Sequence, residues 1–263
     1  MKILSIYYHA PKLSGIEKMI VHYQKRGYRF ISVEVLLEIM RAGMPLKEHL
    51  AFLSLDDGWK QNLKLLPVFE KYNVPVCIFV STQPIIDGNF WWEYVSKTRN
   101  REGLEQFKNL PSDEFYRQLA EIKNTVTLER SAMTVEEVKK IAQHPLVSIQ
   151  AHTVNHPILT TQPDDVVDME MRESKRILEE WTGKNIMAFS YPNGRNTKRE
   201  SDTAQKYFDI AFTTIYGHIH VGQNIMLLPR YGLTGQWPRD LFKVWGVWKV
   251  MKALGNKIGY KSY

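Results

Sequence analysis

Two short segments of the chain combine carboxylates and imidazoles at spacings that suit hydrolytic chemistry. Asp56 and Asp57 are adjacent and precede a glycine, so one carboxylate can bind a cation while the other stays free as a base. His152 and His156 are four residues apart, and two imidazoles at this spacing can converge on one metal ion where the backbone curls. Two histidines and one carboxylate leave coordination positions for water and substrate. Together the segments predict a hydrolytic metal site, although each alone is also typical of a turn or of packed polar side chains.

The surrounding sequence predicts strands and helices in alternation. Short apolar runs rich in β-branched residues alternate with segments whose apolar residues recur every three or four positions. The predicted strands are 3–8, 29–33, 51–55, 76–80, 146–151, 186–191, 209–213 and 226–229. The predicted helices are 15–26, 34–41, 60–72, 134–143, 163–182 and 196–207. This order predicts a (β/α) barrel of parallel strands, whose reactive groups belong at the carboxyl ends of the strands.

Three parts of the chain are expected. Residues 1–235 form the barrel. Within them, residues 84–131 are polar, helical in pattern and too long for a βα loop, so we expect a helical insertion after the fourth strand. Near its start, Trp91 and Trp92 are candidates for stacking on a sugar ring or for anchoring the insertion to the barrel. Residues 236–263 form a basic, aromatic and helical C-terminal tail.

The composition is that of a globular protein. The chain has 263 residues, of which 44% are hydrophobic and 24% charged, which excludes a wholly disordered chain. The single cysteine, Cys77, lies in a predicted strand and cannot form an internal disulfide. Because no apolar stretch has the length of a membrane span and the first residues are too few for a signal-peptide core, we expect a cytoplasmic protein.

The positive charge is concentrated in the tail. Six basic residues and one acid in residues 236–263 supply +5 of the formal net charge of +7. The nearly balanced remainder argues against nucleic acid as a partner. Aromatic residues alternate with lysines in the tail, as in helices that lie on anionic lipid, so we expect peripheral contact with the inner face of the membrane. A basic helix packed on the barrel is the alternative.

Three motifs in order resemble those of the polysaccharide deacetylase family, carbohydrate esterase family four. They read Ser-Leu-Asp-Asp-Gly at 54–58, Ala-His-Thr-Val-Asn-His-Pro at 151–157 and Phe-Ser-Tyr-Pro-Asn-Gly at 189–194. The resemblance extends from residue 3 to about residue 233, without the insertion. It implies a distorted (β/α) barrel with about seven parallel strands that removes N-acetyl groups from acetylated amino sugars of a glycan. It also implies a divalent metal, for which zinc is the expected ion.

The resemblance also implies roles for individual residues. The metal ligands would be Asp57, His152 and His156. Asp56 would be the general base that takes a proton from the attacking water. The backbone N–H of Asn193 would stabilise the oxyanion, and Tyr191 in the same motif would contact the substrate.

Two departures from the family pattern concern the base and the acid. The third motif of the family often carries an arginine where this chain has Ser190, and the later leucine-x-histidine motif is not found where expected. We expect Arg230, within Leu-Pro-Arg, to supply the missing cation beside the base. For the general acid, His9 at the end of the first predicted strand is the first candidate, and His218 or His220 is the second.

Three functions are compatible with these residues. The leading hypothesis is a metal-dependent N-deacetylase acting on an acetylated amino sugar in a glycan or a lipid-linked glycan precursor. The same site is also suited to a small non-sugar amide. The departures at the base and the acid would also fit a glycan-binding protein with impaired catalysis, although all four residues of the first two motifs are present.

Overall fold

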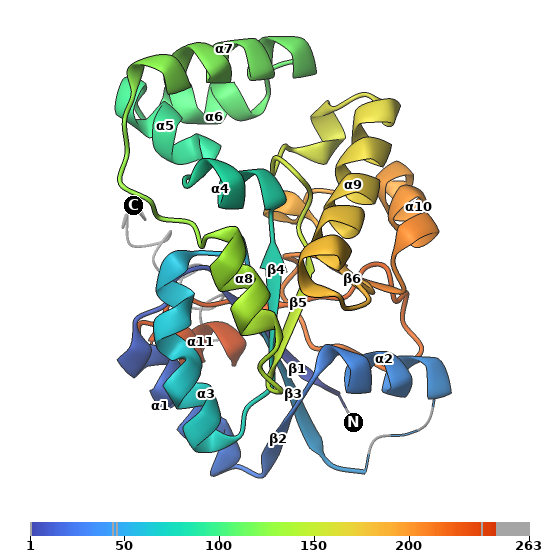
Figure 1. Ribbon diagram of the computed structural model, residues 1–263. Helices are drawn as coiled ribbons and strands as arrows, with labels where there is room; N and C mark the ends of the chain where they lie inside the picture. Colours follow the sequence, from blue (N-terminus) through green and yellow to red (C-terminus); the bar gives the residue numbers. More distant parts are fainter. Residues whose placement is uncertain (1, 44, 46, 238, 246–263) are drawn as a thin grey trace, which may run out of the picture.

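Eight short parallel strands form the centre of the molecule. The computed structural model describes residues 2–43, 45, 47–237 and 239–245. Its strands are β1 (Leu4–Tyr8), β2 (Tyr28–Ile31), β3 (His49–Leu55), β4 (Val76–Val80), β5 (Val147–Ala151), β6 (Ala188–Ser190), β7 (Ile210–Phe212) and β8 (Tyr231–Gly232). The strand order is β7-β6-β5-β4-β3-β1-β8, with β2 also paired to β3. Strands β1 to β6 are labelled in Figure 1.

The segment between β7 and β8 brings the two ends of the sheet together. Leu228 forms one parallel bridge to Phe212 in β7, and β8 then pairs with β1. The curled sheet with helices around it confirms the distorted (β/α) barrel expected from the sequence. The predicted position of the last strand, 226–229, is wrong, because regular pairing starts only at Tyr231. Pro229 has no N–H to donate and interrupts the ladder.

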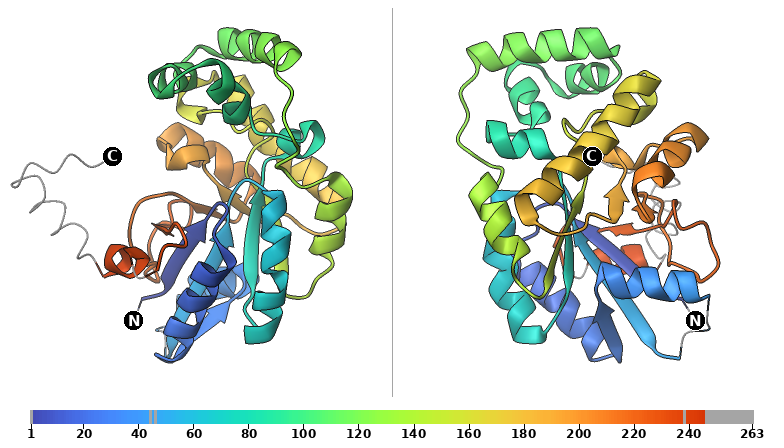
Figure 2. Two further views of the ribbon diagram at one scale, coloured as in Figure 1. Left: turned by 90° about the vertical axis from the view of Figure 1, so that its left-hand side faces the viewer. Right: turned by 45° about the vertical axis from the view of Figure 1, so that its right-hand side comes forward.

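Helices surround the strands and also extend beyond their carboxyl ends (Figures 1 and 2). The helices are α1 (Leu13–Gln24), α2 (Val33–Ala42), α3 (Leu66–Tyr72), α4 (Thr82–Asp87), α5 (Trp91–Thr98), α6 (Arg101–Lys108), α7 (Ser112–Thr125), α8 (Val135–Ala142), α9 (Asp164–Thr182), α10 (Lys198–Tyr207) and α11 (Arg239–Val244). The predicted helix 60–72 is divided into a 3-10 segment, η1 (Lys60–Leu65), and α3. Pro67 explains the division, because proline is tolerated in the first turn of a helix but not in its interior.

The strands have apolar side chains on both faces. In β3, Leu53 and Leu55 belong to the core cluster that includes helices α1 and α3, whereas Phe52 belongs to a second cluster. Phe52 stacks on Phe212 of β7 with ring centroids 4.9 Å apart. Because β3 and β7 are not neighbours in the sheet, this contact runs across the barrel interior. Cys77 is buried in the same second cluster as a free thiol.

Helices α5, α6 and α7 have a small core of their own. It consists of side chains from all three helices, including Trp91, Phe107 and Phe115. These helices lie past the carboxyl end of β4, next to the region where the strands converge (Figure 1). They therefore stand at the edge of the barrel where the predicted site residues follow their strands.

The C-terminal part is described only as far as Trp245. Helix α11 follows a buried turn at Gly235. Residues 246–263, on which most of the predicted membrane contact of the tail rests, lie outside the described residues. Within the described residues, none of the helices combines the length and the apolar character that a membrane span requires.

Candidate metal centre

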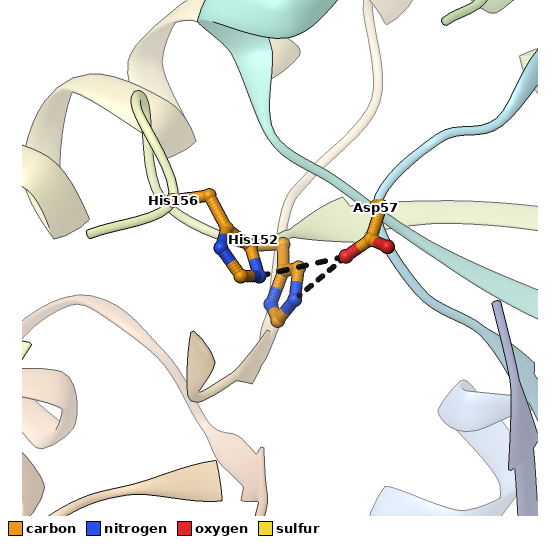
Figure 3. A group of neighbouring side chains, drawn as sticks. All are labelled: Asp57, His152 and His156. Atoms are coloured by element: carbon orange, nitrogen blue, oxygen red, sulfur yellow. Dashed lines mark ion pairs between the residues drawn. The ribbon is translucent and has the colours of Figure 1, made fainter. Parts of the chain in front are cut away.

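Asp57, His152 and His156 meet at the carboxyl ends of β3 and β5 (Figure 3). Asp57 Oδ1 lies 3.4 Å from His152 Nε2 and 3.5 Å from His156 Nε2. Each residue offers one ligand atom, and these atoms all lie within 4.8 Å of one another in a buried position. Two imidazoles and one carboxylate so arranged form a donor set suited to a divalent transition metal.

Hydrogen bonds occupy His152 Nδ1 and Asp57 Oδ2, and the potential ligand atoms Nε2 and Oδ1 are left available for a metal. His152 Nδ1 donates to the Ser190 carbonyl at 2.6 Å, which leaves Nε2 as the unprotonated nitrogen. Trp59 Nε1 donates to Asp57 Oδ2 at 2.8 Å. Asp57 Oδ1 is buried and, among the described residues, has no hydrogen-bond partner. An orphaned carboxylate oxygen facing two imidazoles fits a bound cation.

The protonation states of the ligands also suit a metal. Burial is the main cause that lowers the pKa of His156 to about 3, so this imidazole is neutral at pH 7. Burial alone would raise the pKa of Asp57, but three nearby imidazoles, led by His9, outweigh it and hold that pKa well below its usual range. The site therefore offers one carboxylate and a neutral imidazole, the forms that bind metal.

Unusual backbone conformations collect at this site. Asp57, Thr153, His156 and Asn193 have φ values of 79°, 69°, 58° and 53°. Left-handed conformations are unfavourable for residues with a side chain and persist where the surrounding structure imposes them, often at functional sites. The curl from His152 to His156 is what turns both imidazoles toward Asp57.

Glu170 of α9 holds this curl in place. Its Oε2 accepts hydrogen bonds from the backbone N–H groups of Val154 at 2.8 Å and Asn155 at 2.9 Å. Its Oε1 accepts from Asn155 Nδ2 at 2.7 Å and from the hydroxyl of Tyr116 in α7 at 3.1 Å. Burial raises the pKa of Glu170, and the four hydrogen bonds oppose this. Sequence analysis missed Glu170, although a carboxylate three residues after Val167 on the buried face of α9 is a detectable signal.

Asp56 lies beside the triad but is held by a different partner. Both of its oxygens accept from Arg230, each at 2.8 Å. Arg230 is fully buried and also donates to Ser54 Oγ at 3.0 Å, Ser190 Oγ at 2.7 Å and the Thr213 carbonyl at 3.1 Å. The guanidinium of Arg230 thus lies beside Asp56, where a cation was expected. Ser190, which stands at the position of the family's usual arginine, contacts this guanidinium. The catalytic roles of Asp56 and Arg230 remain predictions.

A cavity of about 380 Å³ is lined by Asp56, Asp57, His152 and His156. His9, which is exposed, and Asn193 also line it, as do Leu104 and Lys108 of α6. The second candidates for the acid, His218 and His220, are not among the lining residues. His218 Nδ1 pairs with the Tyr231 hydroxyl at 3.0 Å. Burial, followed by the charge of Lys2, lowers the pKa of His218 to about 4.

The three aromatic residues predicted to contact substrate line this cavity in different ways. Trp91 is 3% exposed, and its Nε1 donates to the His156 carbonyl at 3.0 Å, so it anchors α5 to the loop that carries His152 and His156. Trp92 is half-buried, and its ring centroid lies 4.7 Å from that of His156. The Tyr191 hydroxyl donates to the Met226 carbonyl at 3.1 Å and is therefore already engaged. Of the three, Trp92 is the best placed to meet a ligand.

Comparisons of the sequence with known proteins point to one family. A family model described as polysaccharide deacetylase matches residues 43–210. The Bacillus subtilis (strain 168) protein YxkH, which carries a polysaccharide deacetylase name, is 29% identical over 99 residues, or 37% of this chain. That match spans only 35% of the relative's own length.

Solved structures show the same fold at low sequence identity. The deacetylase PplD of Streptococcus pyogenes, solved in complex with acetate, has a TM-score of 0.69 at 19% identity, over 93% of this chain and 98% of PplD. IcaB from Ammonifex degensii has a TM-score of 0.68 at 15% identity, over 92% of this chain and 97% of IcaB. At these identities the likeness concerns the fold.

Proposed function

Because this chain belongs to the polysaccharide deacetylase family, we propose that it is a metal-dependent hydrolase that removes N-acetyl groups from an acetylated amino sugar of a glycan. The observation that carries the proposal is the buried convergence of Asp57, His152 and His156 next to a separate carboxylate, Asp56, in one cavity. Such a pair of features supplies a cation site and a base for the same reaction.

The proposed ligands are Asp57, His152 and His156, and the proposed ion is zinc. When bound, a divalent ion polarises the amide carbonyl and makes the attacking water more acidic. Asp56 accepts the proton of that water. Its two hydrogen bonds from Arg230 fix the plane of the carboxylate. Oδ2 also accepts from the Ser190 hydroxyl at 3.5 Å, so the second lone pair of Oδ1 stays available to the water. The backbone N–H of Asn193 is the proposed donor to the oxyanion.

His9 is the proposed general acid, which gives its proton to the leaving amine. It follows β1, lines the cavity and is exposed, as a group that exchanges protons with solvent should be. We expect His9→Ala to lower kcat for acetate release by about 100-fold, the lower end of what general acid–base catalysis contributes. The metal content measured by elemental analysis should not change.

His220→Ala is the matched control for His9, since it removes an exposed imidazole outside the cavity. It should leave kcat unaltered. Full turnover by His9→Ala, or a large loss of turnover in His220→Ala, would contradict the assignment of His9 as the general acid.

The size of the cavity bears on the nature of the substrate. A small non-sugar amide is the main alternative, and it is favoured by the size of the cavity. At about 380 Å³ the cavity is near the small end of the roughly 300–1,000 Å³ typical of ligand sites. A glycan-binding protein with impaired catalysis is a weaker alternative. Arg230 places a cation beside Asp56, although the family's usual arginine is replaced by Ser190.

Acetate release from N-acetylglucosamine oligomers and from small N-acetyl amides tests the proposal on the metal-loaded protein. We expect kcat/KM for the oligomers to be higher by about tenfold or more, since contacts beyond the acetyl group add binding in the transition state. A preference for the small amides would support the first alternative. Binding of oligomers without any acetate release would support the second.

A further inference from the structure

Exposed apolar side chains gather at one edge of the barrel. In the described part of the chain, five large hydrophobic side chains are exposed, by 43% to 63%. One of them, Ile86, lies on α4. The other four, which we call the apolar rim, are Leu13, Ile215, Tyr216 and Trp245. Single exposed apolar residues are ordinary, but a group of them on one edge indicates an interaction surface.

The segments that carry the apolar rim are in contact with one another. The Tyr216 hydroxyl donates to the Gly232 carbonyl of β8 at 3.4 Å. The turn after β8 packs so closely on the first turn of α1 that a Cβ built on Gly15 would lie 2.0 Å from the Gly235 carbonyl oxygen. Leu13 begins that same helix. In the left view of Figure 2, the loops after β7 and helix α11 lie together at one edge of the molecule.

Aromatic contacts join Trp245 to α1. The ring of His22 lies 4.9 Å from that of Trp237 and 6.0 Å from that of Trp245. The hollow beside His22 and Trp237 is lined by the basic side chains of Lys18, Lys25 and Arg26. Tryptophan next to basic side chains is typical of surfaces that lie at the headgroup level of a membrane.

Acidic side chains around the apolar rim are few and already engaged. The sequence from Thr213 to Arg239 contains no acidic residue. Asp240 is buried and accepts hydrogen bonds from the backbone of Thr234 and Gly235. Glu17 of α1 pairs with Lys71 at 2.8 Å. Lys18, Lys25 and Arg26 therefore give the end of the apolar rim near Trp245 a basic character, which complements an anionic lipid surface.

The part of the apolar rim formed by Leu13 and Ile215 lies next to the cavity. His9, four residues before Leu13, lines the cavity, and so does Thr214, which directly precedes Ile215. A flat partner seated on the apolar rim would therefore lie next to the entrance of the site.

We propose that the apolar rim binds the surface of an anionic membrane and that the substrate is an acetylated glycan attached to a lipid in that membrane. The substrate half of this inference rests on the proposed deacetylase function, whereas the membrane half does not. Apolar side chains enter the headgroup region, and the basic side chains around them meet lipid phosphates. The lipid then holds the acetylated sugar at the entrance of the cavity.

Vesicle flotation of the full chain tests the membrane half. We expect the protein to float with phosphatidylcholine vesicles that contain about 30% phosphatidylglycerol, and much less with phosphatidylcholine alone. Replacing two apolar rim residues together, Ile215→Ser and Tyr216→Ser, should weaken the partition coefficient by about tenfold or more. Both side chains are largely exposed, so the fold should tolerate the change. The matched control is Ile86→Ser, which removes an isoleucine that is also more than half exposed but lies elsewhere, and it should float like the unaltered protein.

Several outcomes would overturn the membrane half. They are equal flotation of the double variant and the unaltered protein, no flotation at all, or a dimer in solution that the double variant dissociates in the absence of flotation. Asp56→Asn should float normally, since it leaves the apolar rim intact. A protein that deacetylates soluble oligomers but does not float would contradict the membrane surface and leave the proposed function standing.

Activity tests the substrate half. Acetate release from an acetylated sugar carried on an anchored lipid should depend on the apolar rim, with a loss of about tenfold in the double variant, while release from a soluble oligomer stays unchanged. Equal losses on both substrates would indicate damage to the site and contradict the inference.

Discussion

Asp56→Asn should lower kcat for acetate release by about 1,000-fold, while the metal content stays the same. The substitution keeps the size of the side chain and one acceptor oxygen for Arg230, but it removes the base that would take the proton of the water. Because Asp56 is not one of the three clustered side chains proposed as metal ligands, its loss should not release the ion. Acetate release and elemental analysis of the same preparation measure both quantities.

Stability must be followed in the same variant. Arg230 is fully buried, and leaving a buried charge without its partner costs about 3–5 kcal/mol of folding free energy. Asparagine retains part of the pairing, so we expect a smaller loss in the free energy of unfolding. Asp202→Asn is the control, because Asp202 pairs with Lys198 on the exposed face of α10. Turnover by Asp56→Asn within tenfold of the unaltered protein would exclude Asp56 as the base.

His152→Ala should abolish both metal binding and activity. The imidazole offers one of three ligand atoms and is aligned by the Ser190 carbonyl at 2.6 Å. With only two protein ligands left, the metal-to-protein ratio after dialysis should fall from about one to near zero. His49→Ala is the matched control, because His49 starts β3 at the end opposite to Asp57 and should leave the ratio unchanged.

Glu170→Ala gives a graded form of the same test. Glu170 supplies no ligand atom, but it fixes the backbone between His152 and His156 through Val154 and Asn155. Loss of such a supporting residue typically weakens metal affinity by about 10- to 100-fold. A full metal ratio in His152→Ala, or no change of affinity in Glu170→Ala, would place the ion outside this cluster.

Much of the fold could be predicted because strands and helices are encoded locally. The alternation of apolar runs predicted seven of the strands close to their observed positions. A buried strand appears in the sequence as a short run of apolar residues, so a few consecutive residues are enough to detect it. The division at Pro67 and the shift of the last strand past Pro229 were missed. In both cases a proline overrode the apolar pattern.

The candidate site was only partly predictable, because its supporting contacts join distant segments. Asp56 and Arg230 are 174 residues apart in the sequence, and their pairing needs β8 to lie next to β1. The hydrogen bond between Tyr116 and Glu170 joins helices α7 and α9, and no pattern in the sequence predicts that these helices lie side by side. Nor could the sequence decide whether Trp91 stacks on a sugar or anchors α5, which depends on its hydrogen bond to the His156 carbonyl.

The amino-acid sequence by itself determined the barrel class and the residue types for a metal and a base, because strand periodicity and strand-end motifs are properties of a few consecutive residues. Only the tertiary structure decided which atoms of Asp57, His152 and His156 face one another and which cation accompanies Asp56. It also decided that four of the five exposed large hydrophobic side chains, all but Ile86, share one edge. These relations arise from strand order and loop packing, which bring together segments that are far apart along the chain.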